Sequence, residues 1–162
     1  FNVPITKIGE YEFADFVIAT GTASMGSNGT WYWRKWKSGR AECYGSRNFG
    51  RISLSKAWVS GTSHTGYRSA PQNQALPADL FVDTPEVIEI RLKYTGSDSA
   101  ASTNGGYISI MGEGGSDNYD DLTLVTPSKD NTGSFVISHP FYDSSYTYPA
   151  THIGFNIIGR WK

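Results

Sequence analysis

Apolar and polar residues alternate along several stretches of the chain, and residues 87–94 show the alternation clearly. The apolar positions are Ile88, Ile90, Leu92 and Tyr94, and the positions between them are Glu89, Arg91 and Lys93. Because successive side chains of a strand point to opposite faces, this pattern predicts an antiparallel strand with one buried and one solvated face. Residues 153–161 alternate in the same way.

Shorter runs with strand-like composition extend the pattern along the chain, and they fall at residues 52–59, 107–111, 122–126 and 134–138. Together they predict about seven or eight strands and no helix, which is typical of an antiparallel β-sandwich or jelly-roll-like domain. Long polar stretches rich in small residues separate the runs, at 61–74, 96–106, 112–121 and 139–152. Loops of this length are often functional.

The domain organisation follows from the same pattern. Residues 21–162 contain the strand-like runs without an internal repeat or a low-complexity linker, so we expect one domain there. The chain begins at Phe1 rather than at a methionine. We therefore expect a piece of a longer protein in which residues 1–20 lead in from an upstream region.

The stretch "GTWYWRKWKSGRAECYG", residues 29–45, contains three tryptophans and two tyrosines around a short turn. A two-residue turn at Ser38-Gly39 is the commonest short hairpin connection. Such a turn would pair Trp36 with Ala41, Lys35 with Glu42, Arg34 with Cys43 and Trp33 with Tyr44. Both faces of this hairpin would then carry large aromatic side chains. Either one face packs in the core and the other is exposed to solvent, or the second face is covered by another copy of the chain.

Composition narrows the range of partners. The formal net charge is −1, with 14 basic and 15 acidic residues, so the sequence offers no electrostatic basis for binding nucleic acid. No apolar run approaches the 18–20 or so residues that span a bilayer, and we expect no membrane insertion. Aromatic residues make up 14% of the chain, which suits interfaces and sugar-facing surfaces. The single cysteine, Cys43, is interpreted as a small buried apolar group.

The sequence contains no recognisable signature of an enzyme. The run "GEGGSDNYDD" supplies Glu113, Asp117, Asp120 and Asp121, and its alternatives are a catalytic carboxylate pair, a calcium loop or a solvated turn. Their spacing does not match the calcium-loop pattern, and Asp and Asn are common in turns. His64, His139 and His152 are scattered without a zinc motif. We therefore predict no catalytic residue, no metal and no cofactor.

Two of the long loops carry residues suited to sugar binding, in which a ring stacks on the sugar and polar groups bind its hydroxyls. The candidates are Tyr142, Asp143, Tyr146 and Tyr148 in the 139–152 loop, and His64, Tyr67 and Arg68 in the 61–74 loop. Exposed tyrosines are also typical of adaptable protein-binding loops. The alternative is that these rings fold back onto the edge of the domain.

The hairpin stretch also resembles a known family. "GTASMGSNGTWYWRKWKSGRAECYG", followed at the C-terminus by "HIGFNIIGRWK", is similar to the closing domain of tail-fibre, baseplate and other tail-tip proteins of tailed phages and prophages. That family shows a W-x-x-R-K-W-x-S-G-x-A-E-C-W/Y-G element, which matches Trp31 to Gly45. The stretch "ALPADLFVDTPEVIEI" matches a further family segment through Leu76, Pro77, Phe81, Pro85 and Val87, and the loops between match weakly.

This resemblance implies a trimeric β-structured tip that contacts the host cell surface, often its glycans. The hairpin element is structural in that family, which assigns Trp31, Trp33, Arg34, Trp36, Glu42 and Tyr44 to the scaffold or an interface. We therefore expect a non-catalytic homotrimer, located in the virion or outside the cell, that binds a host glycan or surface protein through its loops. The alternatives are a monomeric carbohydrate-binding module of a polysaccharide-degrading enzyme and a purely structural trimerisation cap.

Overall fold

The computed structural model describes residues 7–8, 11–12, 15–54, 56–60, 65–94, 109–112, 125–139, 147–148 and 151–162. Its strands are β1 (Lys7–Ile8), β2 (Tyr11–Glu12), β3 (Val17–Ser24), β4 (Gly29–Trp36), β5 (Arg40–Asn48), β6 (Ile52–Ser53), β7 (Lys56–Ser60), β8 (Thr65–Arg68), β9 (Val87–Tyr94), β10 (Ser109–Gly112), β11 (Phe135–His139), β12 (Thr147–Tyr148) and β13 (His152–Arg160). These residues form strands and irregular segments without a helix, which confirms the predicted all-β class.

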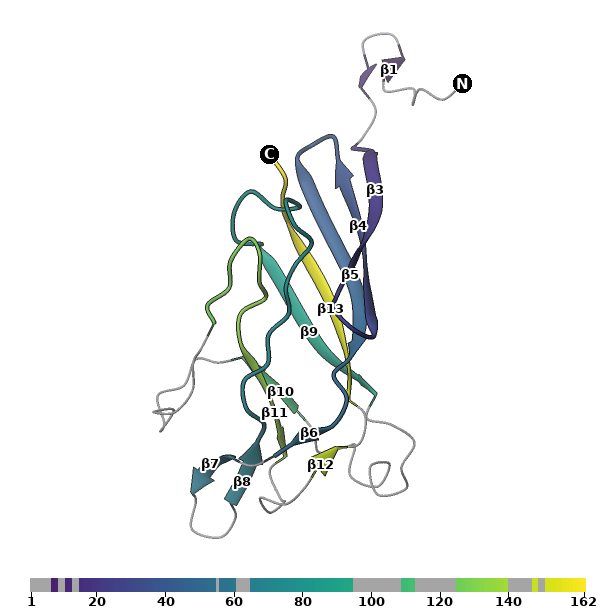
Figure 1. Cartoon of the computed structure of the whole chain (residues 1–162). Coiled ribbons are helices and arrows are strands. Elements are labelled where there is room, and N and C mark those ends of the chain that lie inside the picture. The colour runs from purple at the N-terminus through teal and green to yellow at the C-terminus, as the bar shows by residue number, and fades with distance from the viewer. Residues whose placement is uncertain are drawn as a thin grey trace.

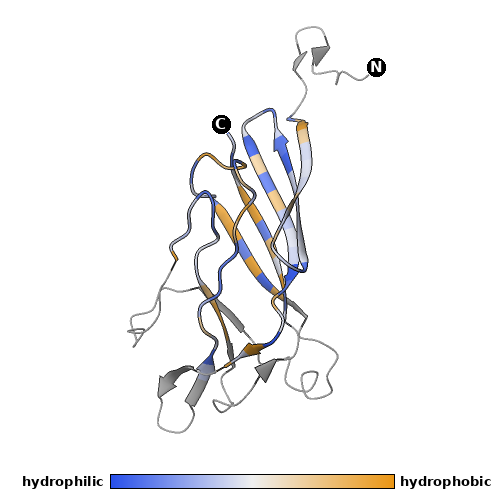
Figure 2. Cartoon of the chain, in the orientation of Figure 1, coloured by the Kyte–Doolittle hydropathy of each residue, from blue (hydrophilic) through white to orange (hydrophobic). Residues whose placement is uncertain are grey.

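The largest element is a five-stranded antiparallel sheet with the strand order β3-β4-β5-β13-β9 (Figure 1). The last strand, β13, lies between β5 and β9, so the C-terminal end of the chain is an inner strand of the sheet. Figure 2 shows hydrophobic and hydrophilic residues alternating along β5, β9 and β13, the pattern expected when only one face is packed. The strand predicted at residues 87–94 coincides with β9.

The β4–β5 hairpin has a different register from the predicted one. Three residues, Lys37 to Gly39, connect the strands, and the backbone N–H of Gly39 donates to the Trp36 carbonyl over 3.1 Å. Gly39 has a φ of 102°, a conformation that glycine adopts readily and that three-residue hairpin loops require. The extra loop residue shifts every pair by one position, so that Trp33 faces Cys43 and Arg34 faces Glu42. The predicted pairing of Trp33 with Tyr44 and of Lys35 with Glu42 was therefore wrong.

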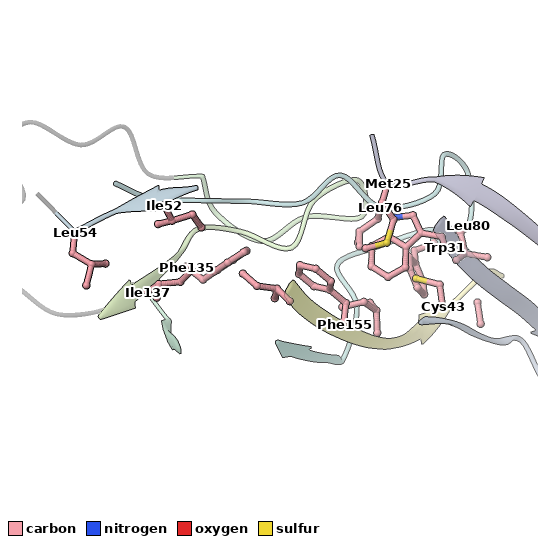
Figure 3. Packing of buried hydrophobic residues seen from close by; sticks show 14 residues of the cluster. Met25, Trp31, Cys43, Ile52, Leu54, Leu76, Leu80, Phe135, Ile137 and Phe155 are labelled. Carbon is pink, nitrogen blue, oxygen red and sulfur yellow. The ribbon is translucent and has the colours of Figure 1, made fainter. Parts of the chain in front are cut away.

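One face of the large sheet, the inner face, carries the core (Figure 3). Its buried side chains from β4, β5 and β13 are Trp31, Ala41, Cys43, Ile153, Phe155 and Ile157. Trp33 packs at the edge of this cluster, and across the pairing it faces Gly21 of β3, where an added Cβ would overlap the indole ring. Burying a large apolar side chain contributes about 1.5–3 kcal/mol, so this layer dominates the stability of the sheet.

Two irregular segments, Ser69 to Pro85 and Val125 to Ser134, run along the inner face and cover it (Figure 1). Backbone hydrogen bonds join them, from Leu76 to Asp130 and from Thr132 to Gln74. The buried Gln74 ties this layer to the sheet, because its amide nitrogen donates to the Met25 carbonyl and its amide oxygen accepts from Arg47.

The remaining strands form smaller sheets. β10, β11, β8 and β7 make a four-stranded sheet at the end of the molecule opposite the β4–β5 turn, and β6 pairs with β12 (Figure 1). The predicted run at 52–59 is divided into β6 and β7, and the run at 134–138 corresponds to β11. Within the run predicted at 122–126, residues 125 and 126 are not in a strand, and residues 122–124 lie outside the described part. β3 begins at Val17, inside the predicted lead-in segment.

Candidate functional site

The second face of the large sheet, the outer face, carries side chains that no described segment covers. Among the residues of β4 and β5 that point to it are Thr30, Tyr32, Arg34, Trp36, Arg40, Glu42, Tyr44 and Ser46. They alternate with the buried residues of the inner face because the side chains of a strand alternate between faces. Tyr32 and Tyr44 are 50% and 48% exposed, so their rings contact solvent over a large area.

Tyr32 and Tyr44 form a cross-strand pair, named the tyrosine pair below. The two residues face each other directly in the register of β4 and β5. Their ring centroids are 5.8 Å apart and their planes differ by 22°, so the rings are stacked. Aromatic pairs of this kind contribute about 0.5–1.5 kcal/mol beyond their buried area. The pair therefore holds both rings in place while one side of the stack stays open.

Beyond Tyr44, the outer face continues with a row of polar residues on β13 and β9. Asn156 of β13 faces Tyr44 on one side and Glu89 of β9 on the other. The Asn156 side-chain nitrogen donates to one oxygen of Glu89 over 3.1 Å, and Arg91 donates to the other oxygen over 3.3 Å. Asn156, Glu89 and Arg91, named the polar triad below, thus fix one another next to the tyrosine pair.

Gly154 creates a hollow between these two groups. It pairs with Ser46 of β5 and with Arg91 of β9, so a gap in the side chains opens beside the polar triad. The hollow has a volume of about 690 Å³ and is lined by the tyrosine pair, the polar triad and Gly154, together with Gly45, Ser46, Leu92 and Phe155. Its size falls within the range of about 300–1,000 Å³ that is usual for small-ligand sites.

A charged cluster lies on the same face, nearer the β4–β5 turn. Glu42 is only 7% exposed, and its two oxygens accept hydrogen bonds from Arg34 and Arg40. Both guanidinium groups also lie over the Trp36 ring, 5.5 and 5.9 Å from its centroid. Glu42 is thus engaged on both sides by arginine, and the cluster ties the two strands together.

The described residues contain no cluster of metal ligands, and their cysteine is buried. No group of three or more His, Cys, Asp or Glu side chains lies close enough to hold a metal ion within this part of the chain. Burial raises the pKa of the Cys43 thiol to about 12, with a smaller contribution from the nearby Glu42 charge. A thiol with that pKa stays protonated at neutral pH and is a poor nucleophile. The residues Glu113, Asp117, Asp120 and Asp121 lie outside the described residues.

Most of the loop residues predicted to bind a ligand lie outside the part of the chain that the structure describes. His64, Tyr142, Asp143 and Tyr146 lie outside the described residues. Tyr148 belongs to β12, where its backbone pairs with Ile52. Tyr67 is partly buried against the core, and Arg68 is 2% exposed.

The hairpin residues predicted to be structural divide between the two faces. Trp31 is fully buried, and its indole N–H donates to the Ala75 carbonyl over 3.0 Å. Trp33 lies on the same inner face, where it packs against the core. Arg34, Trp36, Glu42 and Tyr44 lie on the outer face.

Sequence reasoning missed Tyr32, Gly154 and the polar triad as site residues. One signal was present: Glu89 and Arg91 occupy the polar positions of the alternating pattern at 87–94. Their proximity to Tyr44 depends on β13, which pairs with β5 and β9 across long stretches of sequence.

No family model, curated protein or solved structure matches the chain. In the described part of the chain, no helix is long and apolar enough to cross a membrane.

Proposed function

We propose that this chain is a non-enzymatic recognition domain that binds a glycan on a host cell surface. The observation that carries the proposal is the exposed tyrosine pair beside the polar triad, over a hollow of about 690 Å³. An aromatic wall with a few fixed polar groups is the general design of a small-ligand site, and rings of this kind stack on the apolar faces of sugars. The recognition surface of the proposal is therefore the outer face.

The biological setting of the proposal is the tip of a phage or prophage tail. The resemblance of the element from Trp31 to Gly45 to tail-fibre and baseplate proteins supports this setting. This proposed setting includes a homotrimer, a location in the virion and a sandwich or jelly-roll-like architecture. The large antiparallel sheet with one packed face is compatible with that architecture. Tyr142, Tyr146 and Tyr148 of the 139–152 loop remain predicted contact residues.

The test is binding of the fluorescently labelled chain to a panel of bacterial cells and to their extracted surface polysaccharides. Tyr44→Ala should weaken binding about tenfold or more, a loss equivalent to about 1.4 kcal/mol. Val82→Ala is the control, because Val82 is 51% exposed but lies outside the hollow. Binding that Tyr44→Ala leaves unchanged contradicts the assignment of recognition to the outer face, and failure to bind any cell or polysaccharide contradicts the proposed function.

Light scattering of the purified chain tests the assembly. A trimer that binds cells supports a tail tip, whereas a monomer that binds polysaccharide favours a carbohydrate-binding module. A trimer that binds neither cells nor polysaccharide favours a structural cap.

A further inference from the structure

From the chemistry of the hollow we infer that its ligand is an uncharged saccharide, with one sugar ring against Tyr44 and its hydroxyls over Gly154 and the polar triad. This inference rests on the proposed function and adds the class of glycan and the residues that select it. The hollow borders the exposed ring of Tyr44, and Asn156 follows directly across the sheet. A sugar in that position contacts an aromatic wall and a polar floor at once.

The charge of the hollow argues for a neutral ligand. Among the described residues that line it, the charged ones are Glu89 and Arg91, and these two form an ion pair over 3.3 Å. Their charges cancel, so the lining carries no net charge that would attract a uronate, sulfate or phosphate group. An anionic group bound to Arg91 would also stand next to the Glu89 carboxylate, which repels it.

The hydrogen-bonding groups fit hydroxyls. Glu89 can only accept, Arg91 can only donate, and the amide of Asn156 does both. A sugar hydroxyl is both a donor and an acceptor, so adjacent hydroxyls can use all three side chains. The bonds within the triad hold these groups in position before the ligand arrives, which reduces the entropy lost on binding.

Gly154 determines the depth of the site. A Cβ added there would meet a single neighbour, the Arg91 carbonyl oxygen at 3.8 Å, which is an ordinary contact distance. Gly154→Val therefore fits the strand, and valine favours strand conformation more than glycine does. The new side chain projects into the hollow next to the polar triad, so this variant should fold as well as the original chain and still bind its ligand more weakly.

The experiment measures affinity, by calorimetry or affinity electrophoresis, for a panel that pairs neutral glucans, mannans and galactans with sulfated and uronic polymers. We expect the affinity for a neutral polymer to change little when the salt concentration rises from about 50 to about 500 mM. Over this range, interactions between exposed charges become strongly screened. Gly154→Val should weaken it tenfold or more without lowering the melting temperature, and Glu89→Gln should weaken it severalfold. Thr22→Val is the matched control, because Thr22 lies on the outer face beyond Tyr32, outside the hollow.

Three results would overturn the inference, and each differs from failure of the proposed function. Binding confined to charged polymers, lost with added salt and in Arg91→Ala, would show that the ligand class is wrong while recognition of glycans stands. Neutral binding that survives both Gly154→Val and Tyr44→Ala would place the site elsewhere on the chain. A change in molar mass caused by Tyr44→Ala would identify the outer face as an interface between copies. Failure of the original chain to bind any polymer or cell would instead remove the proposed function together with the inference.

Discussion

The two faces of the large sheet use the aromatic residues of one hairpin in opposite ways. Trp31, on the inner face, is fully buried, contacts Phe155 and satisfies its indole N–H at the Ala75 carbonyl. Tyr32, the next residue, points to the outer face and is half exposed, with the ring of Tyr44 as its stacking partner. The β4–β5 hairpin therefore combines a scaffold with an accessible aromatic surface, since strand alternation separates the two roles.

The same contrast holds for the charged residues of the outer face. Glu42 is almost fully buried between two arginines, and it serves the structure of the hairpin. Glu89 is more exposed, and it lines the hollow together with its partners Asn156 and Arg91. The two clusters therefore differ in burial. The cluster around Glu42 holds β4 and β5 together, whereas the polar triad presents its groups to solvent.

The largest expected effect comes from comparing Trp31→Ala with Tyr32→Ala. Trp31→Ala removes a fully buried indole and its hydrogen bond, so it should cost about 3–5 kcal/mol in the free energy of unfolding. Tyr32→Ala removes one ring of a half-exposed pair and should cost about 1 kcal/mol or less. Urea denaturation of both variants measures the difference. Equal costs would mean that the outer face is covered in solution, for example by a second copy of the chain.

A smaller effect is expected from comparing Glu42→Ala with Glu89→Ala. Glu42→Ala leaves Arg34 and Arg40 without their shared acceptor and should destabilise the chain by about 1–3 kcal/mol. We expect a destabilisation toward the lower end of this range, because both arginine side chains are partly exposed and can be hydrated. Glu89→Ala should change stability by about 0.5 kcal/mol, as exposed ion pairs usually do, while weakening glycan binding. The reverse order of stabilities would contradict the division into a structural cluster and a binding cluster.

The sequence allowed the strands of this sheet to be predicted better than their pairing. Residues 87–94 alternate with period two because one face is buried, and the structure places β9 over the same residues. The register of the hairpin was mispredicted because "WKSGR" fits a two-residue turn as well as the three-residue loop that is present, in which only Gly39 has a positive φ. One residue of loop length changes which side chains face each other across the strands.

The candidate site was harder to predict for a different reason. Tyr32 and Tyr44 come from one hairpin, but Glu89 and Arg91 come from β9, and Gly154 and Asn156 come from the end of the chain. They meet because β13 lies between β5 and β9. No local pattern encodes that placement, since it depends on which distant strands pair. In addition, the sequence around Gly154, which opens the hollow, contains no motif that would mark it as a site residue.

The smallest expected effect concerns the β4–β5 turn, where Asp15 accepts hydrogen bonds from the Ser38 hydroxyl and the Ser38 backbone N–H. These bonds, the hydroxyl bond first, lower the pKa of the Asp15 carboxyl below its ordinary value. A carboxyl with a lowered folded-state pKa stabilises the fold above its unfolded-state pKa, and the contribution disappears as the pH falls through the folded-state pKa. The melting temperature of the original chain should thus exceed that of Asp15→Asn near neutral pH by a small margin that vanishes in acid. Ser38→Ala should reduce this difference in melting temperature because it removes the hydroxyl donor. A difference that does not depend on pH would show that the Asp15 contact acts through packing rather than through its charge.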